Sequence, residues 1–375
     1  MLRMFHRRER GQVLMLTAAL APLLLGMTGM AVDVGGYAGH KRHLQNAADS
    51  ISLAAAQDLC KVTCSDTTVA TATANAWALK NNINPADVTL TFTGGSVNPT
   101  VRATIQNTHS FAFMRVLGIN SKGIGATAAA VKASFGGGAG IVPWSVTQAT
   151  IDAAGSGALI TMKYDTTGSN TGNFGAIRID GPGANTYRDS ASYGSQDVAC
   201  ALTAPNCTTG ACPGIYPTTC AENSPTCNGP QCDPQTGNLI GPTRTAVDFR
   251  MNNTSAICDT FAEAFTALGA GKYHLNGDCN PWTDGLGKCI NNNVGTLCSR
   301  RVIIIPVVDG FGNGGSTPTT IQRFALVYLE GYDSGKCQGN NCDIKGRFVQ
   351  ADVNTHALAG SYDPTALVHF SKLID

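Results

Sequence analysis

The stretch that decides the fold is "AVDVGGYAGHKRHLQNAADSISLAAA", Ala31 to Ala56, which directly follows an uncharged apolar segment. Its apolar and small residues recur at near-helical spacing, with polar residues between them. Gly35, Gly36 and Gly39 each weaken a helix by up to about 1 kcal/mol relative to alanine. Two interpretations follow: one helix that leaves the apolar segment as a stalk, or a surface helix that begins anew near Gly39. The residues predicted to form a small helix-packing face toward a partner helix are Ala47, Ala48, Ala54 and Ala55.

The apolar segment "QVLMLTAALAPLLLGMTGMAV" carries no charge from Gln12 to Val32, and it is long enough for a helix to cross a hydrocarbon core of about 30 Å. Four arginines and one glutamate give the first ten residues a charge of +3. The positive-inside rule therefore predicts a cytoplasmic N-terminus, with everything after about residue 35 outside. A cleaved secretory signal is the alternative, but its apolar region runs to only about 7–15 residues. We expect a retained transmembrane helix over about residues 13–32.

The composition narrows the class of protein. The chain has 375 residues, of which 14% are charged and 43 are glycine, and its net charge is +1. Abundant glycine, with clusters of glycine, asparagine and threonine, favours short strands joined by many loops over a helical bundle. No basic cluster with interleaved aromatic residues follows the apolar segment, so we expect no nucleic-acid partner.

Residues 61–135 predict a small α+β domain outside the membrane. "VTLTFTG", "TVRATIQ" and "GIGATAAAVKAS" alternate as strands, while "SFAFMRVLG" predicts a short helix that ends at Gly118. Such a layer could bury the exposed face of the long helix. "FGGGAG", from Phe135 to Gly140, predicts the boundary of this domain.

Residues 136–375 predict a β-rich domain. The strand candidates are "IVPWSVT", "ALITMKYD", "FGAIRID", "RVIIIPVVD", "RFALVYLEGYD" and "GRFVQADV". Only "TFAEAFTALGAG", from Thr260, has the pattern of a helix. The predicted fold class is therefore α+β: a transmembrane and stalk helix within residues 1–60, a small strand-strand-helix-strand layer, and a β-rich, disulfide-braced domain.

Cysteine usage predicts disulfides in an oxidising compartment. All 14 cysteines follow the apolar segment, and two copies of C-A-x-x-x-P-x-C-x-x-x-x-C form a Cys-rich insertion over Cys200–Cys232. Bridges stabilise by typically 2–4 kcal/mol each where an apolar core is missing. Zinc is the alternative, but the insertion has no C-x-x-C pair and no histidine, which disfavours it. The expected disulfide cysteines are Cys60, Cys64, Cys200, Cys207, Cys212, Cys220, Cys227, Cys232, Cys258, Cys279, Cys289, Cys298, Cys337 and Cys342.

Motifs that carry chemistry are missing from the sequence. "YDTTGS" superficially resembles the metal-adhesion loop of von Willebrand type A domains, with Asp165, Thr167 and Ser169 as ligands, but a strand-like segment follows where a helix is needed. There is no H-E-x-x-H, no G-x-S-x-G, no phosphate-binding loop and no calcium loop. We therefore predict no catalytic, cofactor-binding or metal-binding residues, and no enzyme.

Three segments of the N-terminal region stand out together: "RRERGQ", "AVDVGGY" and "LQNAADSISLAAA". With them, the region resembles the first module of TadG-like proteins of the Tad/Flp pilus-assembly system. The segments "NFGAIRIDG", "YRDS" and "GNLIGPT" resemble later parts of such chains more loosely. Pilin-like precursors are cut after a glycine that Gly11 matches, but their following glutamate is replaced here by Leu16, so a full-length anchor is expected.

This resemblance implies a non-enzymatic, single-pass protein of a bacterial inner membrane that assists assembly or anchoring of a Tad/Flp-type pilus. The implied partners are the membrane and other pilus-assembly proteins, with no small-molecule substrate and no cofactor. The alternative is a surface-displayed adhesin that binds its target independently of a pilus. A secreted hydrolase is a third and more distant hypothesis.

Overall fold

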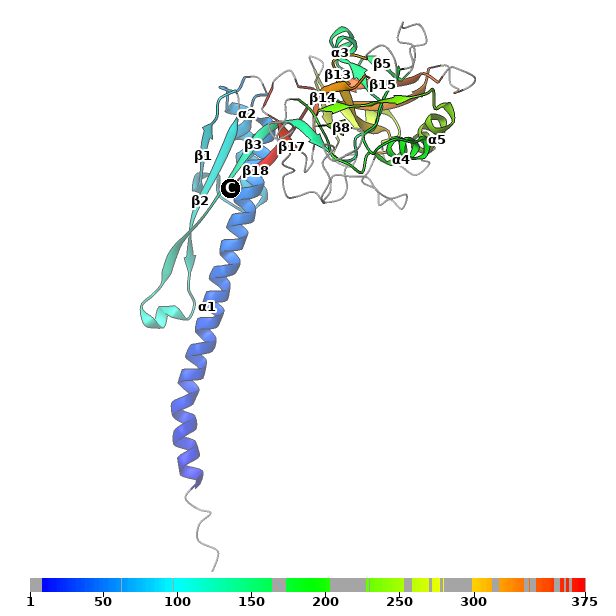
Figure 1. The fold of residues 1–375 in the computed structure, drawn as a ribbon. Helices are drawn as coiled ribbons and strands as arrows, with labels where there is room; N and C mark the ends of the chain where they lie inside the picture. Colours follow the sequence, from blue (N-terminus) through cyan, green and yellow to red (C-terminus); the bar gives the residue numbers. More distant parts are fainter. Residues whose placement is uncertain are drawn as a thin grey trace, which may run out of the picture. The chain divides into compact units, whose positions relative to one another are not determined.

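The chain folds, in a computed structural model, into two compact units whose elements are drawn in Figure 1. Unit 1 comprises residues 1–93, 100–131 and 373–375, and unit 2 comprises residues 94–99 and 132–372. The structure describes residues 9–61, 63–96, 98–163, 173–202, 227–228, 230–252, 258–269, 272–276, 279, 299–311, 317–333, 337, 342–353, 358–360, 362–363 and 366–374. Helices and sheets are both present, so the predicted α+β class is confirmed.

Unit 1 is organised around one unbroken helix, α1 (Glu9–Asp58). The helix includes Pro22 and continues through all three glycines, so the stalk interpretation is correct and no helix begins anew near Gly39. Leu44 and Ile51 are fully buried on its inner face. Tertiary packing of such a face stabilises a helix far more than residue propensity does, and this outweighs the cost of the glycines.

The other elements of unit 1 cover the C-terminal half of α1. Helix α2 (Thr68–Lys80) packs on α1, and the short helix η1 (Pro85–Asp87) leads into the sheet. In this sheet, β1 (Val88–Thr93) pairs antiparallel with β2 (Thr100–Ser110), which pairs antiparallel with β3 (Ser121–Gly138). Val101, Ala103 and Ile105 alternate along β2 and share one core with α1 and α2. The stalk helix and the small α+β layer therefore form a single folded body.

Strands β2 and β3 extend beyond this core as a long hairpin, visible beside α1 in Figure 1. The predicted helix "SFAFMRVLG" is wrong in its first part, because β2 continues to Ser110 and pairs with Ser121. Only the short 3-10 helix η2 (Met114–Leu117) forms at the tip, and it ends at Gly118 as expected. Pairing with β3 extends β2 to Ser110, and this leaves only the residues of the tip free to form a helix.

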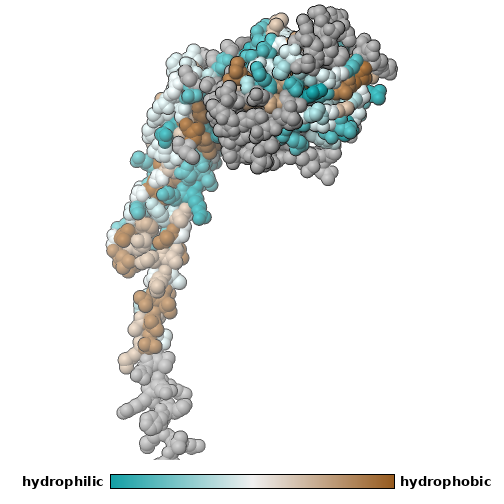
Figure 2. Space-filling view, in the orientation of Figure 1, coloured by the Kyte–Doolittle hydropathy of each residue, from teal (hydrophilic) through white to brown (hydrophobic). Residues whose placement is uncertain are grey.

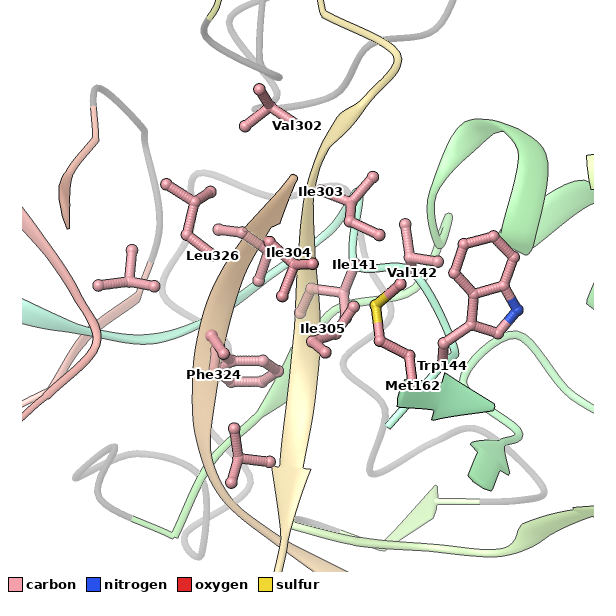
Figure 3. Packing of buried hydrophobic residues seen from close by; sticks show 14 of the residues in the cluster. Ile141, Val142, Trp144, Met162, Val302, Ile303, Ile304, Ile305, Phe324 and Leu326 are labelled. Carbon is pink, nitrogen blue, oxygen red and sulfur yellow. The ribbon is translucent and has the colours of Figure 1, made fainter. Parts of the chain in front are cut away.

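The central sheet of unit 2 has the strand order β4-β13-β14-β15-β5. Strand β13 (Val302–Val308) pairs in parallel with β4 (Val146–Thr147) and antiparallel with β14 (Thr319–Tyr332). Strand β15 (Ile344–Val349) joins β14 to β5 (Leu159–Lys163). Every residue of β13 is buried, as expected of a continuous apolar strand covered on both faces. Figure 3 shows Ile303 and Ile305 of β13 among Met162, Trp144 and Phe324.

Smaller pairs complete unit 2. Strand β8 (Cys227–Asn228) pairs with β9 (Gln231–Cys232), and β9 pairs with β14. Strand β10 (Pro234–Thr236) pairs with β6 (Asn173–Ile177), and β11 (Phe265–Gly269) with β12 (Lys272–Leu275). The remaining described elements, in chain order, are α3 (Gln148–Ala154), α4 (Ala184–Tyr193), β7 (Ala199–Cys200), α5 (Ile240–Met251), α6 (Phe261–Ala264), β16 (Ala351–Asp352), β17 (Leu358–Gly360) and β18 (Val368–Ile374).

The segment "FGGGAG", expected at the domain boundary, has strand structure over residues 135–138, and the two units divide between residues 131 and 132. Strand β3 continues to Gly138 and pairs with β7 and β17, and β18 is its next neighbour in the sheet order. A Cβ at Gly137 would lie 2.4 Å from the backbone oxygen of Ala199, so glycine here permits close strand pairing. Phe135 is buried and packs edge-on against Phe324, with ring centroids 5.2 Å apart. The glycines therefore build a strand of unit 2 in place of a linker.

Helix content in residues 136–375 also differs from the expectation. The helix predicted from Thr260 is only the four residues of α6, started by the Thr260–Glu263 capping box. From Phe265 the chain becomes β11, because pairing with β12 overrides the local helical pattern. Helices α3, α4 and α5 were not expected. They have only 7, 10 and 12 residues, which is short for a 3.6-residue period to be recognised.

Candidate membrane and interaction site

The N-terminal half of α1 presents an apolar surface. Within the described part of the chain, one helix is long and apolar enough to cross a membrane, over Met15–Asp58. Leu23, Leu24 and Leu25 are exposed, as are nearly all side chains from Met15 to Val34 (Figure 2). The Thr28 hydroxyl is satisfied within the helix, because it donates to the Leu24 carbonyl at 2.7 Å. A surface of this kind suits a hydrocarbon environment, where polar groups must be paired internally.

Asp33 ends this apolar surface and binds the tip of the β2–β3 hairpin. Its carboxylate accepts three backbone N–H groups, from Ala112 and Phe113 at 2.8 Å each and from Met114 at 2.6 Å. Although it is charged, Asp33 is only 4% exposed. Bonds of this type to a charged acceptor are stronger than bonds between neutral groups. One side chain therefore fixes the hairpin tip to α1.

The neighbouring glycine makes room for this contact. A Cβ at Gly29 would lie 2.8 Å from Cγ of Phe113. Any larger residue at this position would displace the phenyl ring from the helix. Gly29 and Asp33 lie one turn apart on α1 and face the same hairpin tip, so they act as one docking site.

A cluster of ring side chains lies further along the same two elements. Nδ1 of His40 lies 3.2 Å from Nδ1 of His109, and the Tyr37 and His109 rings meet edge-on with centroids 5.7 Å apart. Nζ of Lys122 lies 5.5 Å from the centre of the Tyr37 ring. Burial lowers the pKa of His40 from its ordinary value, and the neighbouring His109 and His43 lower it further. The cluster continues the hairpin's attachment to α1.

The four alanines predicted to form a helix-packing face lie in the core of unit 1. All four are buried, and three of them, all except Ala54, share one core cluster with Ala70, Ala74 and Ala78 of α2. Within this chain, the helix that packs against this face is α2. Their smallness still matters, because it lets two helices and a sheet approach closely. The residues concerned are Ala47, Ala48, Ala54 and Ala55.

Among the described cysteines, four pairs are within bonding distance. They are Cys60–Cys64, Cys227–Cys232, Cys258–Cys279 and Cys337–Cys342. Cys200 is also disulfide-bonded. The other cysteines of the prediction lie outside the described residues: Cys207, Cys212, Cys220, Cys289 and Cys298.

The described cysteines of the Cys-rich insertion lie inside the fold of unit 2. Cys200, Cys227 and Cys232 are all buried, and β9 joins the sheet of β14. The bridge Cys227–Cys232 lies inside the second copy of the repeated motif. Within the described part of the chain, no three His, Cys, Asp or Glu side chains gather in a way that could hold a metal ion. The loop with Asp165, Thr167 and Ser169 lies outside the described residues.

Unit 2 contains a cavity of about 580 Å³ that sequence reasoning missed. Its polar lining includes Gln148, Asp309 and Arg323. Nε of Arg323 donates to Oε1 of Gln148 at 2.6 Å, and Asp309 accepts from the Thr319 hydroxyl and the Thr320 N–H at 3.1 Å each. These bonds tie α3, and the residue that follows β13, to β14.

Two groups of buried polar side chains in unit 2 also have structural partners. The Tyr187 hydroxyl joins Trp144 Nε1 to the Thr243 hydroxyl, with both distances 2.9 Å. Nε of Arg250 donates to the Ala191 carbonyl at 2.6 Å, linking α5 to α4. Burial, and then the neighbouring Arg300, lower the pKa of Arg250 to about 9. Both groups join α4 to α5.

Comparison with known proteins finds a family match for most of α1. Residues 11–58 match the model of the Tad family, described as Flp pilus-assembly TadE/G-like. The match covers the apolar segment, Asp33 and the alanine face, and it ends where α1 ends. It does not reach "NFGAIRIDG", "YRDS" or "GNLIGPT", whose looser resemblance has no support. No curated protein and no solved structure matches the chain. Residues 11–58 are therefore a Tad-family domain of the Flp pilus-assembly TadE/G-like type, and its apolar helix supports a pilus-associated membrane protein.

Proposed function

We propose that this chain is a non-enzymatic, single-pass protein of the bacterial inner membrane that assists assembly or anchoring of a Tad/Flp-type pilus. Its N-terminus lies in the cytoplasm, and the chain after about residue 35 lies outside. Its partners are the membrane and other pilus-assembly proteins. The cysteines form disulfides in the oxidising compartment where these residues lie.

The observation that carries the proposal is the continuous helix α1. Its residues 11–58 match a pilus-assembly family, and they combine an exposed apolar half with a half that is the core of unit 1. The four arginines and one glutamate before the apolar segment support the cytoplasmic N-terminus, since flanking positive charge sets orientation. A helix that is both anchor and core holds a folded body at the membrane surface.

The test is complementation of a strain that lacks the gene. Electron microscopy should show few or no surface pili in the deletion strain and normal numbers after wild-type complementation. A variant with Leu23→Arg and Leu24→Arg should fail to complement, because each charge at the centre of a span costs about 2.5–3.5 kcal/mol.

The matched control is Leu79→Arg. Leu79 on α2 is 63% exposed, nearly the same as Leu24 at 61%, but it lies outside the apolar segment. This variant should complement fully. Normal piliation in the deletion strain would contradict the pilus role. If those cells also lost adhesion to a surface, the adhesin alternative would replace it.

A further inference from the structure

The tip of the β2–β3 hairpin exposes apolar side chains. Val116 is 88% exposed, Leu117 67%, Phe113 51% and Ile119 44%. They lie on and beside η2, at the point of the hairpin farthest from the core of unit 1 (Figure 1). A contiguous exposed apolar patch of this kind marks a binding surface for a protein or a membrane.

The position of the patch on α1 is fixed. The three hydrogen bonds to Asp33 and the contact of Phe113 with Gly29 hold the tip beside the turn Gly29–Asp33. That turn is the outer end of the uncharged segment, which at 1.5 Å per residue is about 30 Å long. A helix that crosses the bilayer with this segment therefore brings the hairpin tip to the outer edge of the hydrocarbon core.

The side chains around the tip suit a lipid interface. Apolar surface continues from the exposed half of α1 to the hairpin tip, and a hydrophilic band follows beyond it (Figure 2). Residues 110–125 contain Arg115 and Lys122 but no Asp or Glu, which favours anionic headgroups. Tyr37 lies on α1 just past Asp33, and amphipathic rings are enriched at this depth.

We propose that the hairpin tip is a second membrane contact, which inserts Val116, Leu117 and Phe113 into the outer leaflet of the bilayer that α1 spans. The ligand is phospholipid at the boundary of headgroup and acyl chain, the depth reached by interfacial apolar segments. Two attachment points prevent unit 1 from rotating about the axis of α1. The proposal rests on the anchoring of α1 described above.

The experiment places one environment-sensitive dye at a time on the full-length chain. Val116→Cys, Leu24→Cys and Leu79→Cys are each labelled with a nitrobenzoxadiazole maleimide and reconstituted into vesicles of phosphatidylcholine and phosphatidylglycerol. Quenching is measured with lipids that carry a nitroxide near the headgroup or deep in the acyl chain, and with aqueous iodide. The exposed Leu79 is the matched aqueous control, and Leu24 reports on the span.

The dye at position 116 should be quenched several-fold more by the shallow nitroxide than the dye at 79, and should be protected from iodide. The dye at 24 should be quenched best by the deep nitroxide. Quenching at 116 by iodide alone, with 24 still in lipid, would overturn the inserted tip and leave the anchor intact. Protection of 116 from both quenchers would show that protein covers the tip, which also overturns the proposal. Iodide quenching at 24 would overturn the anchor itself.

Discussion

Ala48 and Ala55 show how single methyl side chains determine the core of unit 1. Both are fully buried between α1, α2 and the sheet, where a larger side chain has no space. From the sequence, their smallness predicted close packing, but the partner could not be identified. The role of Asp33 is harder still to predict, because its carboxylate accepts three hydrogen bonds from residues about 80 positions later in the chain. Contacts between segments so far apart in sequence leave no local pattern.

Replacing Ala48 and Ala55 by leucine should destabilise unit 1. Overpacking of a core typically costs 1–3 kcal/mol, while leucine remains a good helix former and leaves the apolar segment unchanged. Thermal unfolding of the full-length protein in detergent, followed by circular dichroism, should show a lower midpoint. The matched control is Ala72→Leu with Ala76→Leu on the exposed side of α2, which should unfold like the wild type. A double variant at 48 and 55 as stable as this control would contradict the burial.

The elements of unit 2 differ in how far the sequence predicts them. "RVIIIPVVD" and "RFALVYLEGYD" are rich in β-branched and aromatic residues, and they are the paired strands β13 and β14. Helix α4 has only 10 residues, which is short for its period to be recognised, and its core contact depends on Tyr187 reaching Trp144 and Thr243. Strand β11 begins inside a helical pattern, because pairing with β12 decides its conformation. Tertiary contacts, and not local propensity, therefore determine the conformations of α4 and β11.

Removal of the bridge Cys258–Cys279 should cost more stability than removal of Cys337–Cys342. The first pair is separated by 21 positions and the second by 5. From the loop-closure entropy of the unfolded chain, the two bridges stabilise the fold by about 3 and about 2 kcal/mol, respectively. Double alanine variants of each pair should differ in this order in thermal unfolding under oxidising conditions. A reductant should remove the difference between variants and wild type. Unchanged stability without Cys258–Cys279 would show that the thiols are not bridged in the folded protein.

At the scale of the whole molecule, the central feature is α1, whose two halves have different surroundings. The first half of α1 has an exposed apolar surface, and the second half is the core of unit 1, with no break between them. The length of the apolar segment and the preceding arginines were sufficient to predict an anchor. That the helix continues without interruption could not be predicted from its glycines, since local propensity opposes it.

The topology of the full-length chain in the membrane tests this central claim most directly. Alkaline phosphatase and green fluorescent protein are each fused after Asp375, since the first is active only outside the cytoplasm and the second fluoresces only inside. Alkaline carbonate then separates integral from peripheral protein, and a variant with Arg7→Glu, Arg8→Glu and Arg10→Glu is the matched control for orientation. We expect an active phosphatase, a dark fluorescent protein and a carbonate-resistant, full-length chain, with lower phosphatase activity in the control. A fluorescent C-terminus, or a shortened chain released by carbonate, would contradict the single-pass anchor.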